Sequence, residues 1–370
     1  MLRRSVLVAV VAFTAVLFST ATPVAAAVRP FSPPQTVAGG CGTFSADSVV
    51  TSSGALVGFA TCPGPSGLPI RFFSRNPDGS VNRSQATGFF GTVMAVTYDT
   101  TATYVLYFND SQVRIGKRTN TGVFGSRPVD TRPAGVGSSG DIIARDGRWF
   151  GVWSKPVGPG EPEFAQRELF SSGTGLGISR VTTTADNIDD HAPTLAYSGT
   201  IPVAIWARSP ISEFPGGPSN LMVKKYIGGT WQGERVFASL GTANLVPDMY
   251  ITAGRTFVTW HRDGFIVVAS NATGSFTSHR FNTPGFEPRV AASRTSGVID
   301  HVFVTWTAFG TTGDRVFFAE SASTGSVQGT WNGTTIASRA SAIGVGGFAT
   351  KAIVTYATPS TSTVTARAQT

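Results

Sequence analysis

The sequence predicts an all-β fold built from repeated four-stranded units that close into a ring. Short runs rich in Val, Ile, Phe, Thr, Tyr and Trp alternate with Gly, Asn, Asp and Ser turns, and no long segment after residue 27 has the period of an amphipathic helix. One strand pattern recurs seven times, and the two ends of the chain carry complementary parts of one unit. Together these observations predict a seven-bladed β-propeller.

The recurring pattern is a strand that ends in an aromatic residue. These aromatics follow one another at intervals of 48, 46, 53, 54, 46 and 50 residues, a period typical of propeller blades. A ring of aromatics at one strand end could stack on sugars, but packing between neighbouring blades is the favoured interpretation. The seven are Phe59, Tyr107, Trp153, Trp206, Trp260, Trp306 and Tyr356.

The other strands of each unit are expected around these second strands. Alternating side chains along each strand would let one face pack on the preceding blade and the other on the next. We expect first strands at 141–144, 193–196, 247–250 and 288–291, third strands at 69–74, 112–117, 221–226, 265–269 and 315–319, and fourth strands at 177–182, 234–238, 278–281 and 334–337.

The two chain ends together supply one unit. The seventh unit begins at Ser341 and stops at Thr370, after a third strand at 363–368. The segment 33–38 precedes the first unit and has the pattern of a fourth strand with its exit turn. We therefore expect this segment to complete the last blade and close the ring, which would leave only short strand edges exposed.

The first 27 residues are expected to be a secretory signal peptide. Arg3 and Arg4 form a basic start, residues 5–21 are almost uninterruptedly apolar, and small residues at 23–27 suit cleavage. A twin-arginine signal is a less favoured alternative. A lipoprotein site at Cys41 would lie too far beyond the apolar run. We expect a single propeller domain over 28–370, secreted, extracellular and monomeric, with no membrane contact after signal removal.

Charge and cysteine content narrow the classes of partner. The formal charge of +8 falls to +6 when Arg3 and Arg4 leave with the signal peptide, and the remaining basic residues are scattered singly rather than in a stripe. This distribution argues against a nucleic-acid partner. Cys41 and Cys62 are the two cysteines, and in an exported chain they are expected to form a disulfide beside the first blade.

Several turns resemble those of sialidase-like, Asp-box (BNR) propellers, in which a Ser-x-Asp-x-Gly-x-Thr-Trp turn joins the third and fourth strands. The turns at 171–175, 228–231 and 325–331 keep parts of that motif. The resemblance implies the propeller architecture. An active sialidase would also place an arginine clamp, a Tyr/Glu nucleophile and an acidic residue at one face. Arg289 begins a first strand, and Tyr98, Tyr197 and Tyr250 lie within first strands, with no Glu placed to activate them.

The densest group of chemically active side chains is the run at 186–191, with sequence DNIDDH, beside two long Pro- and Gly-rich connections at 155–163 and 208–220. Three interpretations stay open: the carboxylates pin the loop, Asp189 and Asp190 bind Ca²⁺, or a His/Asp pair acts on a glycan as acid and base. The candidate binding residues are Asp189, Asp190, His191, Glu161, Glu163 and Arg208, and the channel mouth near Arg289, Asp248 and Tyr250 is the second choice.

The sequence contains none of the motifs HExxH, GxSxG or the nucleotide-binding P-loop, so no catalytic residue is nominated. The favoured hypothesis is a secreted propeller that binds a glycan or cell-wall polymer on its loop face. The alternative is a sialidase-like carbohydrate-active enzyme, either a glycosidase or a polysaccharide lyase. A convergent pocket over the channel would favour the enzyme, and a shallow groove would favour the binding protein.

Overall fold

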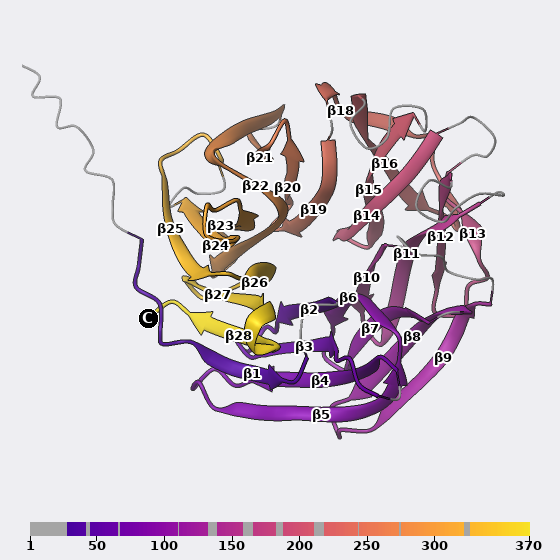
Figure 1. Cartoon of the computed structure of the whole chain (residues 1–370). Helices are drawn as coiled ribbons and strands as arrows, with labels where there is room; N and C mark the ends of the chain where they lie inside the picture. The colour runs from indigo at the N-terminus through magenta and orange to yellow at the C-terminus, as the bar shows by residue number, and fades with distance from the viewer. Residues whose placement is uncertain are drawn as a thin grey trace, which may run out of the picture.

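The computed structural model describes residues 28–41, 45–65, 67–109, 111–131, 139–157, 166–182, 188–210, 218–242, 244–273, 275–321 and 326–370. The proposed signal peptide, residues 1–27, lies outside these ranges. The described residues form antiparallel sheets arranged radially around a common axis (Figure 1). This confirms the all-β prediction. None of the described helices has the length and apolar character needed to cross a membrane.

The first three sheets each contain four consecutive strands, paired in chain order. The first contains β2 (Ser45–Val50), β3 (Leu56–Thr61), β4 (Pro69–Arg75) and β5 (Val81–Phe90). The second contains β6 (Thr92–Tyr98), β7 (Ala102–Asn109), β8 (Gln112–Thr119) and β9 (Phe124–Asp130). The third contains β10 (Gly140–Arg145), β11 (Arg148–Pro156), β12 (Arg167–Gly173) and β13 (Ser179–Arg180).

The next two sheets depart from this simple order. The fourth contains β14 (Ile188–Ser198), β15 (Ile201–Pro210) and β16 (Pro218–Ile227), and β16 pairs with both β17 (Thr230–Trp231) and β18 (Arg235–Thr242). The fifth is a seven-stranded sheet of β19 (Asn244–Thr252), β20 (Arg255–Arg262), β21 (Phe265–Thr273), β22 (Ser275–Thr295), β23 (Val298–Ala308), β24 (Arg315–Ser321) and β25 (Trp331–Ser338). The first half of β22 pairs with β21 and its second half with β23.

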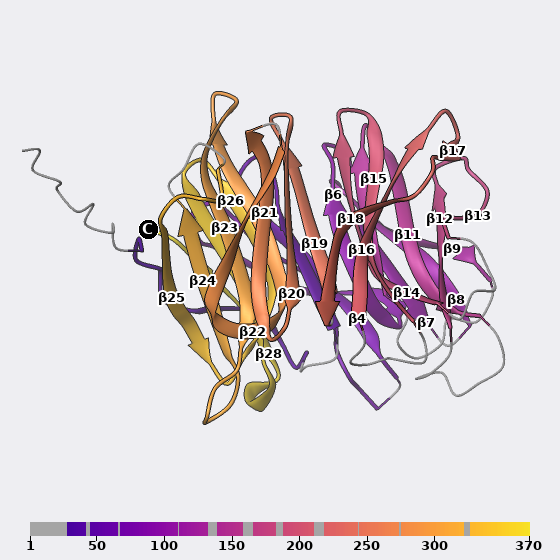
Figure 2. The same ribbon diagram turned by 90° about the horizontal axis from the view of Figure 1, so that it is seen from above.

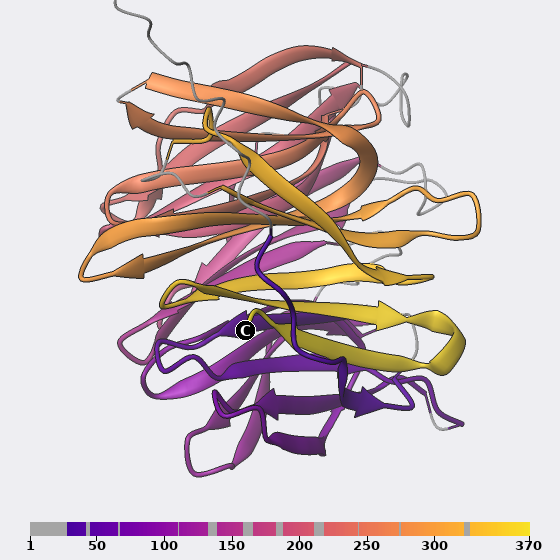
Figure 3. The same ribbon diagram turned by 90° about the vertical axis from the view of Figure 1, so that its left-hand side faces the viewer.

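The last sheet joins the two ends of the described chain. It contains β26 (Ser341–Phe348), β27 (Lys351–Thr358) and β28 (Thr363–Ala368), with a short 3-10 helix at Pro359–Thr361, and β1 (Gln35–Gly39) pairs with β28. Figure 3 shows the indigo N-terminal segment against the yellow C-terminal strands. The expected pairing of the segment 33–38 with the last unit is therefore confirmed.

Further contacts hold the N-terminal segment against the last sheets. Arg29 forms an ion pair of 3.2 Å with the buried Glu320, and the Phe31 ring packs edge-on against Phe318 at a centroid distance of 5.1 Å. The guanidinium of Arg367 donates to the Ser32 carbonyl over 2.8 Å. The N-terminal strand is thus held by its backbone ladder, by apolar packing and by charge.

The aromatic residues of the second strands are core residues, as expected. All seven are buried, and none exposes more than 4% of its surface. Trp153, Trp206 and Trp306 pack with apolar residues of the preceding repeat unit. In the view of Figure 2 the strands stand side by side across these interfaces. The core is therefore a set of clusters between neighbouring units rather than a single central one, because the centre of the ring is a channel.

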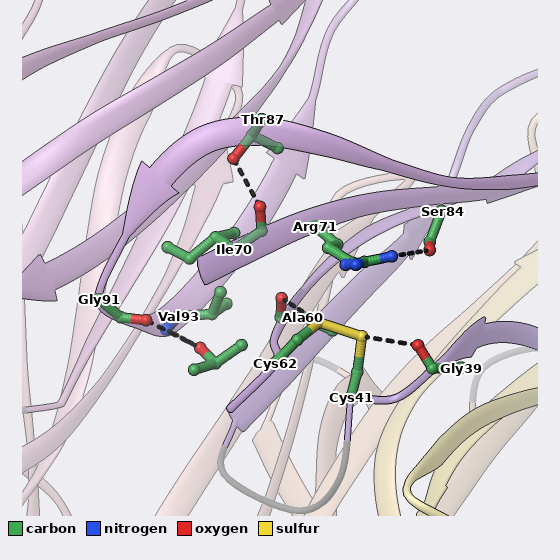
Figure 4. The surroundings of a disulfide bond; sticks show 11 residues. Gly39, Cys41, Ala60, Cys62, Ile70, Arg71, Ser84, Thr87, Gly91 and Val93 are labelled. Carbon is green, nitrogen blue, oxygen red and sulfur yellow. Dashed lines mark hydrogen bonds between the residues drawn. A yellow bond between two sulfur atoms is a disulfide. The ribbon is translucent and has the colours of Figure 1, made fainter. Parts of the chain in front are cut away.

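The expected disulfide joins Cys41 to Cys62 (Figure 4). Cys41 lies before β2 and Cys62 follows β3, so antiparallel pairing of these strands brings both residues to one edge of the sheet. Both side chains are buried. A buried disulfide fits a protein that folds in an oxidising compartment.

Candidate functional site

A cavity of about 730 Å³ occupies the centre of the ring. Its walls are the strands nearest to the axis, namely β2, β6, β10, β14, β19, β26 and the second half of β22, as Figure 1 shows for the labelled strands. Hydroxyl groups of Ser45, Ser48, Thr92, Ser139 and Thr194 belong to residues that line it. The cavity is therefore polar along much of its wall.

One position on each of these strands belongs to a ring of residues around the channel. We call it the channel ring: Asp47, Ala95, Asp141, Thr194, Asp248, Arg289 and Gly344. Hydrogen bonds to the neighbouring strand support this alignment for three pairs of ring members. Asp47, Asp141 and Asp248 each accept a backbone N–H from the residue that follows the next ring member: Val96, Leu195 and Val290, over 2.6, 2.6 and 2.7 Å.

The strands bulge immediately before the channel ring. The ladder register shifts just before Ala95, Thr194, Asp248, Arg289 and Gly344. A bulge inserts an extra residue and re-aims the side chains that follow it, and bulges are over-represented beside functional sites.

Three of these bulges share a strained backbone. Ala192, Val246 and Glu287 have φ values of 48°, 51° and 51°, in the left-handed region that side chains other than glycine rarely adopt. Each precedes a proline, and the ring residue follows that proline. Such strain costs on the order of 1–3 kcal/mol per residue and clusters at binding and active sites. The repeated strain therefore points to the channel ring as a candidate site.

The channel ring holds three carboxylates around one guanidinium. Burial raises the pKa of Asp47 to about 7, although the nearby Arg289 and the Val96 hydrogen bond oppose the rise. Burial also raises the pKa of Asp141, to about 6, and that of Asp248. Burial alone would lower the pKa of Arg289, but the attraction of Asp248 and Asp47 outweighs it. All four side chains lie deep in the molecule and stay partly accessible because they face the channel.

Arg289 is oriented by the backbone rather than by an ion pair at contact distance. Its Nε donates to the carbonyl of Ile343 over 3.2 Å and its Nη1 to that of Pro288 over 3.1 Å. Two tyrosines, Tyr197 and Tyr250, line the same cavity, and burial raises the pKa of both phenols. Residues with guanidinium, hydroxyl, phenol and carboxyl groups thus line one cavity.

The residues that the sequence favoured lie at the start of β14, next to this channel. Asp189 accepts bonds of 2.8 and 2.6 Å from the Arg167 guanidinium and lies 3.0 Å from Nδ1 of His191. Burial alone would raise the pKa of Asp189, but the bonds from Arg167 and His191 outweigh it and lower the pKa to about 2. The carboxylate of Asp189 is therefore committed to an internal ion pair.

Asp190 is committed in the same way. It accepts bonds from the indole of Trp206 over 2.6 Å and from Nε of Arg208 over 2.7 Å. Arg208 also bonds to Glu234. Burial raises the pKa of Asp190 in spite of these bonds. The structure thus brings Asp189, Asp190, His191 and Arg208 together, as expected, but as a buried cluster.

The same arrangement occurs one unit earlier. The indole of Trp153 donates to Asp130 over 3.3 Å, and Lys155, two residues further along the strand, bonds to the same carboxylate over 2.9 Å. Two successive units thus place a tryptophan and a basic residue around a buried aspartate. This repetition indicates that the pattern stabilises the fold.

The remaining sequence-based expectations at this site stay predictions. Glu161 and Glu163 lie outside the described residues, as do parts of both long connections. In the described ranges, no group of three or more His, Cys, Asp and Glu side chains is arranged to hold a metal ion. Calcium at Asp189 and Asp190 would have to compete with two arginines for their carboxylates.

The channel ring was the second choice from the sequence, through Arg289, Asp248 and Tyr250, and the sequence analysis missed Asp47 and Asp141. A usable signal was present. In three units the ring residue directly follows the proline of a first strand, at Pro193, Pro247 and Pro288. A proline that interrupts strand pairing marks a bulge, and the next side chain is then re-aimed.

No family model matches this sequence, and no curated protein matches it. Among solved structures, the chain is similar to the β-propeller domain of Cps50 (Swd1) from Myceliophteria thermophila, with a TM-score of 0.55, 9% identity, and coverage of 90% of this chain and 99% of that one.

It is also similar to a puromycin hydrolase (TM-score 0.53, 15% identity, 86% of this chain) and spans about half of that chain's length, 50%. A third similar structure is the fucose-specific lectin from Aleuria aurantia, with a TM-score of 0.51, 11% identity, and coverage of 82% of this chain and 98% of that one. At identities this low, the structural similarity shows a shared fold alone. That fold is the β-propeller.

Proposed function

We propose that this protein is a secreted, monomeric, seven-bladed propeller that binds a glycan or cell-wall polymer at its channel mouth, with residues 1–27 as a signal peptide and 28–370 as one domain. The blade count rests on β22, whose two halves pair with different neighbours. Counted as the last strand of one blade and the first of the next, β22 divides the seven-stranded sheet into two four-stranded blades.

The observation that carries the proposed function is the channel ring behind its strained bulges. Strain repeated at one depth in three strands is costly, and binding would account for its retention. Saccharides present many hydroxyl groups, and the serine, threonine, carboxyl and guanidinium groups of the cavity supply both donors and acceptors for them. The fucose-specific lectin among the similar structures shows that a protein of this fold can bind a saccharide. The fold alone does not assign that function to this chain, so the proposal rests on the residues of the cavity.

The test is binding to a panel of soluble polysaccharides, with the cavity changed one residue at a time. We expect Arg289→Met to weaken binding because it removes the central cation of the channel. Arg148→Met makes the same chemical change at the exposed first residue of β11 and should leave binding intact. Asp248→Asn keeps an acceptor for Val290 N–H and provides a second variant if Arg289→Met folds poorly. Wild-type protein that binds no member of the panel would contradict the proposal.

A second candidate function is that of a sialidase-like carbohydrate-active enzyme. Neither proposal includes a nucleic-acid partner. The raised pKa of Asp47, about 7, favours it, because a carboxyl group that keeps its proton near neutral pH can act as a general acid on a glycosidic bond. New reducing ends or unsaturated products from the same panel, lost in Asp47→Asn, would support catalysis. Binding without any product would support the binding protein.

A further inference from the structure

A second cavity lies away from the channel, between the third and fourth blades. We call it the outer notch; Ser179, Arg180, Lys224, Tyr226, Thr230 and Trp231 contribute to its lining, and its volume is about 370 Å³. It includes the turn at 228–231, whose Gly-x-Thr-Trp sequence is part of the Asp-box resemblance but has no role in the channel.

The notch lies where the outer strand of one blade is short and that of the next is interrupted. The fourth strand of the third blade, β13, has two residues, whereas β5, β9 and β25 have ten, seven and eight. In the fourth blade, β17 also has two residues, and pairing with β16 resumes only at β18. Regular outer-strand pairing is therefore interrupted in both blades beside the notch.

Direct bonds between the two blades fix the walls of the notch. Nζ of Lys224 donates to the Val181 carbonyl over 2.6 Å, and the indole N–H of Trp231 donates to the Ser171 hydroxyl over 2.9 Å. Both bonds cross from the fourth blade to the third. The notch is thus a pre-formed space, and a ligand that enters it pays little to order its walls.

Aromatic rings form one side of the notch. Tyr226 and Trp231 meet edge to face at a centroid distance of 5.4 Å, and both rings pack on the buried Phe150, at 4.9 and 5.9 Å. Tyr226 and Trp231 keep part of their surface exposed. Partly exposed rings on a rigid base are suited to stack against the apolar face of a sugar.

Donor groups stand beside these rings. Nε of Arg180 pairs with the buried Glu168 over 2.8 Å, which leaves the side chain exposed but oriented. Lys224 is 3.6 Å from Glu234. The carboxylates of Glu168 and Glu234 offset much of the positive charge of Arg180 and Lys224. The notch therefore offers N–H donors with little net charge. This combination favours a neutral, hydroxyl-rich ligand over a highly charged one.

We infer that the outer notch is a second saccharide-binding site, which takes one neutral pyranose unit against Tyr226 and Trp231, with its hydroxyl oxygens bonded by Arg180 and Lys224. This inference rests on the proposed glycan binding and names a site separate from the channel. Two sites on one rigid ring would allow a polymer to bind at both, which raises its apparent affinity above that of a short oligosaccharide.

The test uses hexasaccharides of xylose, N-acetylglucosamine and galacturonate, with calorimetric affinity and stoichiometry as readouts. Ser179→Tyr fills the notch from a strand whose backbone pairing is unchanged, and Arg180→Gln replaces the long, charged guanidinium by a shorter, neutral amide with fewer N–H donors. Ile178→Tyr places the same tyrosine at the neighbouring exposed residue outside the notch and is the matched control.

We expect a neutral hexasaccharide to occupy two sites per wild-type chain and one per Ser179→Tyr chain, and Arg180→Gln to weaken the notch site by about tenfold. Ile178→Tyr should match the wild type, and galacturonate should bind the notch more weakly than the neutral sugars. Unchanged affinity and stoichiometry in both notch variants, with loss in Arg289→Met, would overturn this inference and leave the channel proposal standing. No binding of any probe by the wild type would overturn both.

Discussion

Replacing Asp47 by Asn tests the electrostatics of the channel without changing its shape. The amide oxygen can still accept the Val96 N–H, but the side chain can no longer lose a proton. In the wild type, burial raises the pKa of Asp47 from 3.8 to about 7. Between these values the folded carboxyl group holds a proton that the unfolded one has released. Its contribution to stability is therefore complete below pH 4 and is lost as pH rises through 7.

The magnitude follows from the pKa difference of about three units, each equivalent to about 1.4 kcal/mol. The full shift would give about 4 kcal/mol, and water in the channel should reduce this to about 2 kcal/mol, because it screens the charge. We expect the Asp47→Asn variant to gain about 2 kcal/mol on the wild type between pH 4.5 and pH 8, or about 3 °C in thermal midpoint for a chain of this length.

Denaturant unfolding of both proteins at several pH values measures this difference directly. Other titrating groups are common to both proteins and cancel to first order. Asp78→Asn is the control, because hydrogen bonds from Ser80 lower the pKa of that exposed carboxyl group, and its loss should act with the opposite sign. An Asp47→Asn difference that stays constant across pH, or falls as pH rises, would refute the reasoning.

Three further predictions concern the scaffold. Deleting residues 30–39 should cost on the order of 5 kcal/mol, since it removes β1 and the buried Val37 and exposes the edge of β28; an unchanged calorimetric midpoint would show that the ring does not need this strand. Replacing both Cys41 and Cys62 by Ser should cost about 3 kcal/mol in denaturant unfolding, because the bridge closes a loop with a sequence separation of 21; two titratable thiols in the oxidised wild type would disprove the bridge. Asp189→Asn should cost about 3 kcal/mol by leaving Arg167 without its carboxylate, and CaCl₂ should leave the wild-type thermal midpoint unchanged; a calcium-dependent rise that vanishes in the variant would instead support a calcium site.

The repeat could be predicted because each blade carries its own local signal. A strand that ends in a buried aromatic depends on residues close together in sequence, and so does the pairing of Cys41 with Cys62. Departures occurred where contacts between blades decide the structure. The fourth strand expected at 177–182 is reduced to Ser179–Arg180. Beyond it the Val181 N–H still bonds to the Leu169 carbonyl over 2.8 Å, but the Val181 carbonyl accepts from Lys224 of the next blade and the Leu169 N–H bonds to the Thr182 hydroxyl.

The candidate site shows the same limit. Asp189 and Asp190 were conspicuous as adjacent acids, but their arginine partners are 22 and 18 residues away and are found only once strand register is known. The channel ring is more dispersed, because each blade contributes one residue to it. Its members become conspicuous only when the repeats are aligned and the corresponding residues of the first strands are compared. Arg289 is then the one basic residue among three aspartates.

The pairing of β1 with β28 also sets an order of events during synthesis. Gln35 pairs with Ala366, so the strand that finishes the ring precedes all the other described strands in the chain and its partner follows them. Until the final strand leaves the ribosome, β1 has no partner for its backbone groups, and the blades behind it form an open arc. Contacts of such long sequence separation form slowly. During folding the open arc therefore exposes the unpaired edge of β1 until β28 joins it, and exposed strand edges are prone to pair with other chains.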